Sequence, residues 1–341
     1  MRRYYCTLFD KHYLYQGLAL HSSLIATTDS FILYALAMDE ETFTVLSKLN
    51  YESLTPIRID DLLTDEIRGV RENTSHGQFC WVNQPLICRH LLDNYGLEMV
   101  TYLESDSFFY SDPEVLFEEL GESSVSLVPH NFSSEFDNSD VAGRFCVQFN
   151  AFRNDGRAHS VLADWIKANY SYSKLRPNFY PGQKCIDGWP EKFPGIKVLK
   201  NKGAGVAPWN IRGYLLSESN GIPLVDGVPV VFYHYHQYGR LVNGAHELGS
   251  YPMTLDVVDT FYRPYVSALR HAEHVVRNID PKFKFRREYA NSTTFCDLLM
   301  APSVDLLFSF FSRMKRKLRG RLNIFSDEFF SGDTDAKVNK S

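Results

Sequence analysis

The chain has 341 residues, of which 44% are hydrophobic and 14% aromatic, so it can bury the core of one large domain or two modest ones. Its formal net charge of -5 excludes a nucleic-acid binder that depends on an overall basic surface. No run of about 18 apolar residues occurs, and Asp10 and Lys11 interrupt the apolar start, so we expect neither a transmembrane helix nor a signal peptide.

Cysteine usage bears on the cellular compartment. The cysteines are scattered without a CxxC pair, at Cys6, Cys80, Cys88, Cys146, Cys185 and Cys296. In the absence of a secretory signal, this pattern predicts reduced thiols of a cytoplasmic protein rather than disulfides or zinc ligands.

The N-terminal third alternates between predicted strands and predicted helices. The strands are expected at residues 4–9, 31–38, 55–59 and 98–103. The helices are expected at residues 14–25, 40–49, 59–70 and 78–95. Strands separated by helices predict an α/β fold with a mostly parallel sheet and helices on both faces.

The alternation continues and then gives way to irregular chain. A helix is expected at 112–120, with Asp112 as its N-cap and Pro113 at its first position. Further elements are expected as strands at 124–129, 145–152 and 228–239 and a helix at 157–172, with an irregular stretch at 131–144. Glycine and proline are dense between 177 and 229, and long loops inside a domain are commonly functional.

Two acidic residues directly follow the strand predicted at 98–103. Glu104 and Asp106 are two residues apart, so on a continuing strand they would share a face. Like charges this close favour a bound cation, and magnesium or manganese takes carboxylate oxygens. The alternative is a strand end that turns two ordinary acids into water. Parallel sheets bind ligands beyond the carboxyl ends of their strands, which favours the functional interpretation.

A histidine pair follows the region rich in glycine and proline. In "FYHYHQYG", strand alternation would place His234 and His236 on one face, with Tyr233 and Tyr235 on the other. One imidazole joining two carboxylates makes a mixed site that suits manganese. The alternative is a partly buried structural pair, and a zinc site made by both histidines lacks a nearby third ligand.

Several common nucleotide-binding and hydrolase motifs are absent. The sequence has no GxxxxGK[ST] loop, no GxGxxG after the first strand and no GxSxG. Their absence disfavours P-loop nucleotidases, dinucleotide-binding enzymes and hydrolases with a nucleophile elbow. A metal ion can still hold a nucleotide through its diphosphate without a glycine-rich loop.

From Tyr4 to Gly239 the chain resembles a bacterial group of family-8-like nucleotide-diphospho-sugar transferases of the GT-A fold. The motifs that carry the resemblance occur in the expected order as "YCTLFDKHYLYQGLALHSSL", "YLESDSFFYSDPE", "VQFNAFRND", "GQKCIDGWPEKFPG", "GVAPWN" and "FYHYHQYG". The resemblance implies a Rossmann-like mixed sheet and a divalent cation, Mn²⁺ or Mg²⁺, held by a D-x-D motif. It also implies a nucleotide-sugar donor and a glycan or lipid-linked acceptor.

The resemblance assigns roles to residues by their positions in these motifs. Glu104 and Asp106 stand at the D-x-D, and His236 stands at the later metal-binding histidine, with His234 as its rival. Gln183 matches a position near the anomeric carbon, and Arg240 could neutralise the departing diphosphate. The positions that match donor contacts are Thr7, Phe9, Asp10, Tyr13, Asp39 and Asn150.

Two departures from the family pattern leave other functions open. Glu104 replaces the first Asp of D-x-D, and Gly182 replaces the acid that usually precedes Gln183. The leading expectation is a retaining glycosyltransferase of the hexosyltransferase type that acts in surface polysaccharide or lipopolysaccharide assembly. The alternatives are a relative that binds nucleotide sugars or glycans without turnover, or a sugar nucleotidyltransferase.

The sequence divides into three predicted regions. Residues 1–245 form the transferase domain, 246–325 a helical extension and 326–341 a disordered tail. An apolar stripe followed by six basic residues in 304–321 is typical of an interfacial helix on anionic lipid. The alternative is a helix docked on the domain with a solvated basic end. The first interpretation places a cytoplasmic protein on the inner face of the membrane.

Overall fold

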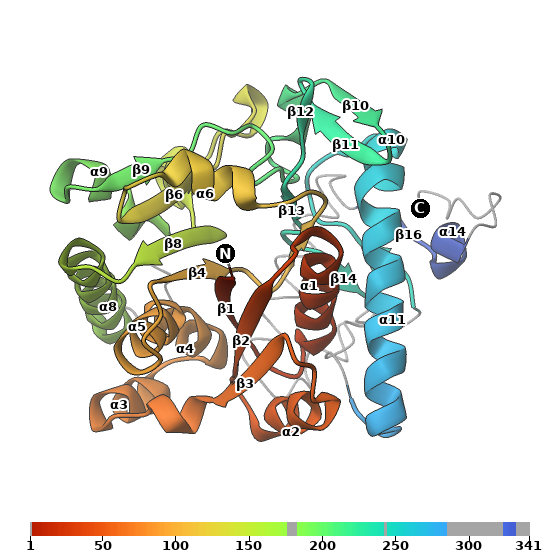
Figure 1. The fold of residues 1–341 in the computed structure, drawn as a ribbon. Coiled ribbons are helices and arrows are strands. Elements are labelled where there is room, and N and C mark those ends of the chain that lie inside the picture. Colours follow the sequence, from red (N-terminus) through yellow and green to blue (C-terminus); the bar gives the residue numbers. More distant parts are fainter. Residues whose placement is uncertain (1, 176–182, 242–243, 285–322, 332–341) are drawn as a thin grey trace. The chain divides into compact units, whose positions relative to one another are not determined.

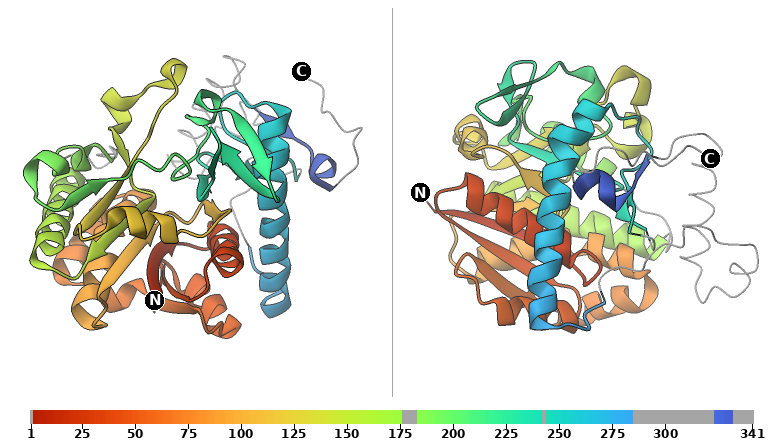
Figure 2. Two further views of the ribbon diagram at one scale, coloured as in Figure 1. Left: turned by 45° about the horizontal axis from the view of Figure 1, so that its top comes forward. Right: turned by 90° about the vertical axis from the view of Figure 1, so that its right-hand side faces the viewer.

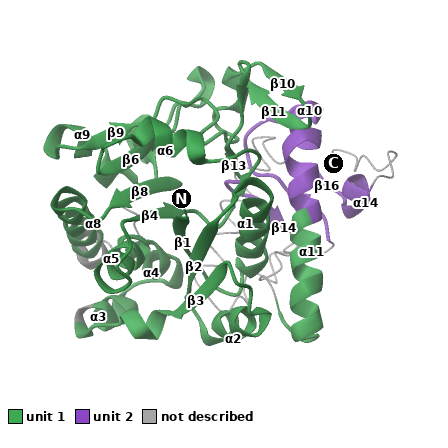
Figure 3. Cartoon of the chain, in the orientation of Figure 1, with its two compact units in different colours: residues 1–234, 268–285 green, residues 235–267, 286–341 purple. Residues whose placement is uncertain are grey.

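The computed structural model describes residues 2–175, 183–241, 244–284 and 323–331. The chain divides into two compact units (Figure 3). The first unit comprises residues 1–234 and 268–285, and the second comprises 235–267 and 286–341.

The first unit contains an eight-stranded sheet (Figure 1). Its strands are β1 (Arg3–Phe9), β2 (Phe31–Ala37), β3 (Leu54–Arg58), β4 (Met99–Leu103), β6 (Val125–Pro129), β7 (Phe145–Cys146), β8 (Phe149–Arg153) and β9 (Ile196–Val198). The order is β3-β2-β1-β4-β8-β6-β7, with β9 beside β6. The first four strands are mutually parallel, whereas β8 is antiparallel to β4 and β6. The expected mixed sheet with a parallel half is therefore confirmed.

Helices cover both faces of this sheet (Figures 1 and 2). They are α1 (Leu14–Thr27), α2 (Glu40–Leu49), α3 (Asp65–Asn73), α4 (His76–Val82), α5 (Gln84–Asn94), α6 (Glu114–Leu120), α7 (Ser139–Ala142), α8 (Gly156–Leu175) and α9 (Trp189–Lys192). Alternation along β1 explains the two layers: Cys6 and Leu8 join a core that includes residues of α3, α4, α5 and α8. On the other face, Tyr5 packs against Phe117 of α6 and Phe9 against Gly17 of α1.

Two predicted helices are broken by local backbone chemistry, and a third begins later than expected. The helix predicted at 78–95 is two helices that meet at Asn83, because Pro85, in the first turn of α5, has no amide hydrogen to continue the hydrogen-bond ladder of α4. The helix predicted at 59–70 is a 3₁₀ turn, η1 (Ile59–Leu62), followed by α3, which Thr64 caps. Helix α6 begins at Glu114 with Pro113 as its N-cap, so the expectation of Asp112 at the N-cap and Pro113 at the first position is wrong by one residue. Asp112 Oδ1 still accepts from the Glu114 amide at 2.9 Å.

The strand predicted at 228–239 is also broken. It consists of β12 (Val228–Pro229), β13 (Phe232–His234) and β14 (Gly239–Arg240). Strand β13 ends at His234, so the expectation that His234 and His236 share a strand face is wrong. Strand β13 pairs antiparallel with β5 (Ser107–Phe109), with His234 opposite Ser107. Strand β12 instead joins a three-stranded sheet with β10 (Leu216–Ser219) and β11 (Ile222–Val225).

Short helices shape the loops of the first unit. They are the 3₁₀ helices η2 (Ser134–Phe136), η3 (Gln183–Ile186) and η4 (Ile211–Gly213). The strand predicted at 145–152 is two strands, β7 and β8, and Val147 and Gln148 form the connection between them.

The second unit contains a small antiparallel sheet of β14, β15 (His246–Glu247) and β16 (Ile324–Phe325). Its helices are α10 (Leu255–Val257), the π-helix η5 (Val258–Tyr262), α14 (Asp327–Ser331) and the first turn of α11 (Arg263–Ile279). Buried His246 joins two segments, since its Nδ1 lies 2.6 Å from Tyr238 Oη and its Nε2 2.9 Å from Asp327 Oδ1. Helix α14 thus lies within the tail that was expected to be disordered.

Some sequence predictions lie outside the described residues. These are the interfacial helix at 304–321, Cys296, Gly182 and the last ten residues of the predicted tail. Within the described ranges, no helix is both long and apolar enough to cross a membrane. None of the five described cysteines forms a disulfide, although the Sγ atoms of Cys6 and Cys88 lie 3.6 Å apart.

Candidate functional site

Polar residues gather at one edge of the sheet. Strands β1, β2 and β4 are parallel, so their carboxyl ends meet there, followed by Asp10, Asp39 and Glu104 respectively. Antiparallel β8 begins at the same edge, because Phe149 pairs with Leu103. The topology therefore brings together the ends of four strands that the sequence had singled out separately.

Glu104 and Asp106 lie in a turn and not on a strand. Strand β4 ends at Leu103, and the Ser107 amide donates to the Glu104 carbonyl at 3.1 Å. The expectation that strand alternation aligns the two acids is therefore wrong, because the chain reverses between β4 and β5. Burial and the neighbouring Asp106 carboxylate raise the pKa of Glu104 well above its usual value. Gln84 Nε2 donates to Glu104 Oε1 at 2.8 Å.

Asp106 is paired with His234. Its Oδ1 lies 3.1 Å from His234 Nε2, and the two side chains are only 18% and 8% exposed. The pairing of β5 with β13 produces this contact, since His234 is opposite Ser107, the neighbour of Asp106. The edge of the Trp209 ring packs on the imidazole, with ring centroids 5.2 Å apart.

The other side of His234 contacts the connection between β7 and β8. His234 Nδ1 lies 2.9 Å from Gln148 Oε1 and 3.8 Å from Cys146 Sγ. Burial raises the pKa of the Cys146 thiol well above its usual value, so it is a neutral neighbour. The Val147 amide donates to Gln183 Oε1. The predicted catalytic Gln183 is therefore held beside the Asp106–His234 pair by one short connection.

Two of the predicted donor contacts have buried polar atoms. Thr7 and Asn150 are fully buried on β1 and β8. Thr7 Oγ1 and Asn150 Oδ1 have no hydrogen-bond partner in the part of the chain that the structure describes. Asn150 Nδ2 donates to the Ser126 carbonyl at 3.1 Å, which fixes the orientation of the amide. Both atoms are enclosed by protein, so the roles of Thr7 and Asn150 as donor contacts remain predictions.

Asp10 and Asp39 both organise backbone next to the site. Asp10 Oδ2 lies 2.9 Å from His76 Nε2, and its Oδ1 accepts from the His12 amide at 2.9 Å. Burial opposes ionisation of Asp10, but these hydrogen bonds outweigh it and lower the pKa of the carboxyl group. Asp39 accepts from the Thr42 amide at 2.7 Å as the N-cap of α2, and from the Lys11 amide at 2.8 Å.

The aromatic donor candidates differ in accessibility. Phe9 is buried against Gly17, whereas Tyr13 is 43% exposed at the N-terminus of α1. The contact of Phe9 explains why a glycine stands in α1, because a Cβ at Gly17 would lie 2.3 Å from the phenyl ring.

His236 and Arg240 belong to the second unit. His236 lies in a turn closed by the Tyr238 amide, which donates to the Tyr235 carbonyl at 3.0 Å. Arg240 is the last residue of β14. Their predicted roles as metal ligand and diphosphate contact remain predictions.

Sequence reasoning missed three residues of this region. Gln148 contacts His234, Gln84 contacts Glu104, and His76 contacts Asp10. A polar side chain within the apolar run "VQFNAF" was the available signal for Gln148. The capping box formed by Ser75 and Gln78 was the signal for His76, because it starts α4 at that residue.

The donor set fits a divalent cation that keeps open positions. Among the described residues, no cluster of three or more His, Cys, Asp or Glu side chains could hold a metal ion. One carboxylate and one imidazole face each other at 3.1 Å, however. Two adjacent ligands on an octahedral ion with bonds of about 2.1 Å would lie about 3.0 Å apart. The pair therefore fits an ion whose other positions are filled by water and phosphate.

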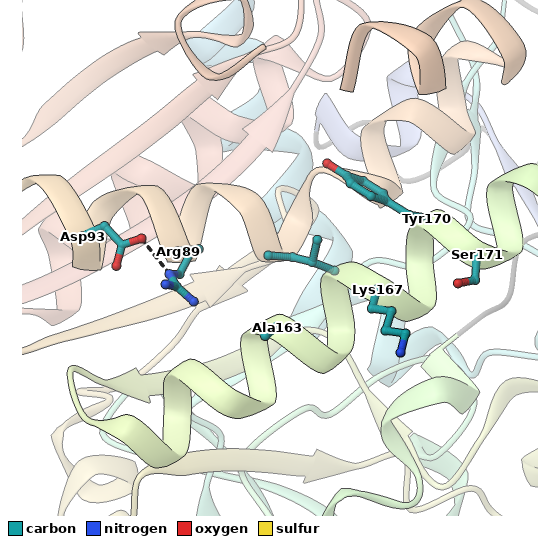
Figure 4. Close-up of a pocket in the computed structure, with 7 residues that line it drawn as sticks. Arg89, Asp93, Ala163, Lys167, Tyr170 and Ser171 are labelled. Atoms are coloured by element: carbon teal, nitrogen blue, oxygen red, sulfur yellow. Dashed lines mark hydrogen bonds and ion pairs between the residues drawn. The ribbon is translucent and has the colours of Figure 1, made fainter. Parts of the chain in front are cut away.

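A separate pocket lies between α5 and α8 (Figure 4). Arg89 and Asp93 on α5 form an ion pair at 2.6 Å, and Lys167 and Tyr170 of α8 also line the pocket. No residue predicted for catalysis, donor binding or metal binding is among its lining residues.

Sequence comparison finds relatives without an assigned activity. No protein-family model matches the chain. Uncharacterized protein YfnF of Bacillus subtilis is 29% identical over 290 residues, which cover 82% of this chain and 95% of that protein. Uncharacterized protein YfnD of the same organism is 25% identical over 288 residues, which cover 82% of this chain and 93% of that protein.

Structural comparison identifies the fold. The crystal structure of the galactosyltransferase LgtC, in complex with donor and acceptor sugar analogs, matches with a TM-score of 0.50. The match covers 79% of this chain and 95% of LgtC at 12% sequence identity. The chain shares its fold with this galactosyltransferase, and the predicted GT-A fold is confirmed.

Proposed function

We propose that this protein, which has the fold of the GT-A glycosyltransferases, moves a sugar from a nucleotide-diphosphate donor to a glycan or lipid-linked acceptor. The contact between Asp106 and His234 supports this proposal most strongly. This contact brings an imidazole nitrogen and a carboxylate oxygen together near the end of β4, and folds with parallel strands bind ligands beyond such strand ends.

The donor binds along the edge formed by β1, β2 and β8. Asp10, whose lowered pKa keeps it ionised, and Asp39 accept hydrogen bonds from ribose hydroxyls. By resemblance, Asn150 and Thr7 lie at positions that match donor contacts, and they line β8 and β1 beneath this edge. The exposed ring of Tyr13 provides apolar surface for the base, and Phe9, buried against Gly17, supports the start of α1 beneath it.

Asp106 and His234 hold Mn²⁺ or Mg²⁺, with Glu104 and His236 as the remaining candidate ligands. When bound, the cation supplies positive charge that offsets the charge of the leaving nucleoside diphosphate. Gln84 Nε2 already donates to one oxygen of Glu104 at 2.8 Å, whereas Asp106 Oδ1 lies beside the imidazole of His234. Asp106 is therefore the principal carboxylate of the site.

Transfer needs groups at the anomeric carbon and at the diphosphate. Gln183, held by the Val147 amide, orients the sugar, and Arg240 neutralises the departing diphosphate. By resemblance the reaction is a hexosyl transfer that retains the anomeric configuration. Retention predicts that the product anomer, identified by NMR, matches that of the donor.

The proposed setting is the cytoplasmic face of the membrane, in surface polysaccharide or lipopolysaccharide assembly. The pattern of residues 304–321 supports this part of the proposal, because an apolar stripe with a basic end binds anionic lipid. A lipid-linked acceptor would then be presented at the same surface.

The test is thermal stabilisation of the full chain by nucleotide sugars with Mn²⁺, repeated with a chelator. Asp106→Asn keeps the shape of the side chain but removes the anionic ligand. Asp93→Asn is the matched control, since Asp93 lies on α5 in an ion pair with Arg89. We expect one donor to raise the melting temperature by several degrees in a metal-dependent way. The shift should disappear in Asp106→Asn and persist in Asp93→Asn.

Product analysis then separates the candidate reactions. A transferase releases a nucleoside diphosphate from the stabilising donor, whereas a sugar nucleotidyltransferase releases pyrophosphate. Stabilisation without release identifies a binding protein that does not turn over. A folded protein that no donor stabilises would contradict the proposal.

A further inference from the structure

We infer that Gln148 is a positioning residue whose amide oxygen fixes His234 with its Nε2 lone pair directed at the cation position beside Asp106. This inference rests on the proposed function. It concerns a residue that neither the motifs nor the comparisons single out.

The first step is the hydrogen bond between Gln148 and His234. Gln148 is fully buried, and its Oε1 lies 2.9 Å from His234 Nδ1. An amide oxygen only accepts hydrogen bonds, so the imidazole must donate from Nδ1. In the neutral ring, the second nitrogen Nε2 then carries a lone pair.

The second step is what that lone pair faces. His234 Nε2 lies 3.1 Å from Asp106 Oδ1, and both side chains are nearly buried. Two acceptors at this distance repel each other unless a positive charge is shared between them. A proton on Nε2 satisfies them as an ordinary ion pair, and a divalent cation bound by both atoms satisfies them as in metal sites where an outer residue accepts from the other nitrogen of a ligating histidine. The inference is the second case.

The third step is what holds Gln148. Gly205 has a φ of +72°, and a Cβ there would lie 2.1 Å from Gln148 Nε2, so only glycine leaves room for the amide. Asn210 Nδ2 donates to the Gly205 carbonyl at 2.9 Å, which fixes this loop. The adjacent Trp209 packs edge-on against His234. The motif "GVAPWN", to which no chemistry was assigned, thus packs against both Gln148 and His234.

The experiment measures Mn²⁺ affinity of the full chain by electron paramagnetic resonance of free Mn²⁺, with and without nucleoside diphosphate. Gln148→Met keeps the length of the side chain but has no oxygen acceptor. Gln148→Glu keeps an acceptor for Nδ1. Gln78→Met is the matched control, because Gln78 is also buried but serves the capping box of α4.

We expect Gln148→Met to weaken Mn²⁺ binding by about 10- to 100-fold, as for other outer residues of metal sites. Gln148→Glu should bind Mn²⁺ about as tightly as the unmodified chain does, because it keeps an oxygen acceptor for Nδ1. Gln78→Met should lower the melting temperature without changing Mn²⁺ affinity. Equal losses in folded Gln148→Met and Gln148→Glu would show that Gln148 only packs, and would overturn the inference.

The failures of the two proposals are distinguishable. If the unmodified chain binds Mn²⁺ but neither Gln148 variant alters the affinity, the inference fails and the proposed function stands. If the unmodified chain binds no Mn²⁺ under either condition, both fail.

A second measurement does not depend on the folding of any variant. Long-range ¹H–¹⁵N NMR of the Mg²⁺-loaded chain reports which imidazole nitrogen carries the proton. The His234 signals are assigned by their loss in His234→Gln. Protonation at Nδ1 alone supports the inference, and a proton on Nε2, with or without one on Nδ1, would overturn it.

Discussion

At the scale of single residues, the site depends on which histidine meets Asp106. The sequence offered His234 and His236 as rivals, and positional resemblance favoured His236. In the structure His234 Nε2 lies 3.1 Å from Asp106 Oδ1 and its other nitrogen is engaged by Gln148. Both nitrogens of His234 therefore have defined partners in the first unit.

This geometry predicts different outcomes for the two histidines. His234→Gln should lower the Mn²⁺ affinity at least about tenfold, because it removes one of two adjacent ligands. The stabilisation by donor and Mn²⁺ should weaken accordingly. His236→Gln, the comparison variant, should have a smaller effect. Titration of Mn²⁺ against the thermal shift measures both affinities. A loss confined to His236→Gln would assign the ligand to the turn instead.

Residue types were predictable at this scale, but their contacts were not. The carboxylates and the histidines were identified because few other side chains bind hard cations. The end of strand β13 at His234 was not predicted. Gln237, in the turn that follows, adopts a left-handed φ of 65°, and a residue other than glycine gives no sequence indication of that conformation. Gln148 was missed because a single amide in an apolar strand does not reveal which ring nitrogen it meets.

At the scale of elements, hydrophobic periodicity predicted the strands and helices that form the sheet edge. The errors lie where a cap or proline interrupts a continuous pattern, as at Asn83 and Pro85 between α4 and α5. Helix α1 contains a buried histidine, His21, that contacts the residues just before β3. His21 Nε2 lies 2.8 Å from Ser53 Oγ, and its ring stacks on Tyr51.

This link predicts a loss of stability in acid. Burial lowers the pKa of His21 to about 4. The unfolded chain takes up a proton near pH 6.5, whereas the folded chain resists it, so the free energy of unfolding falls as the pH drops from about 6.5 to about 4. The difference in pKa corresponds to at most about 3 kcal/mol.

His21→Gln tests this prediction, since glutamine can bond to Ser53 but does not titrate. Urea unfolding at pH 7 and at about pH 4.5 gives the free energy of unfolding of both proteins. We expect the unmodified chain to lose about 2 kcal/mol more than His21→Gln between these pH values. Equal losses would show that other groups govern the acid sensitivity.

At the scale of the whole molecule, the sequence did not predict the division into two units. The second unit combines residues 235–267 with chain that follows residue 285, and such long-range pairing leaves no periodic signal in the sequence. Strand β16 pairs with β15, and Asp327 contacts buried His246. Residues 323–331 therefore belong to a folded unit, although their composition is typical of a disordered tail.

This arrangement determines how the membrane prediction must be tested. Deleting the chain from residue 304 onward would also remove β16 and α14, so a lost function would not identify its cause. Replacing the six basic residues Arg313, Lys315, Arg316, Lys317, Arg319 and Arg321 by glutamine leaves β15–β16 pairing and the His246–Asp327 contact in place. Each basic residue near an anionic surface contributes about 1 kcal/mol of binding free energy.

The substituted chain should therefore fail to float with vesicles rich in phosphatidylglycerol, whereas the unmodified chain should float with them and not with neutral vesicles. An unchanged melting temperature confirms that the second unit is intact, and flotation equal to that of the unmodified chain would contradict electrostatic attachment through residues 304–321.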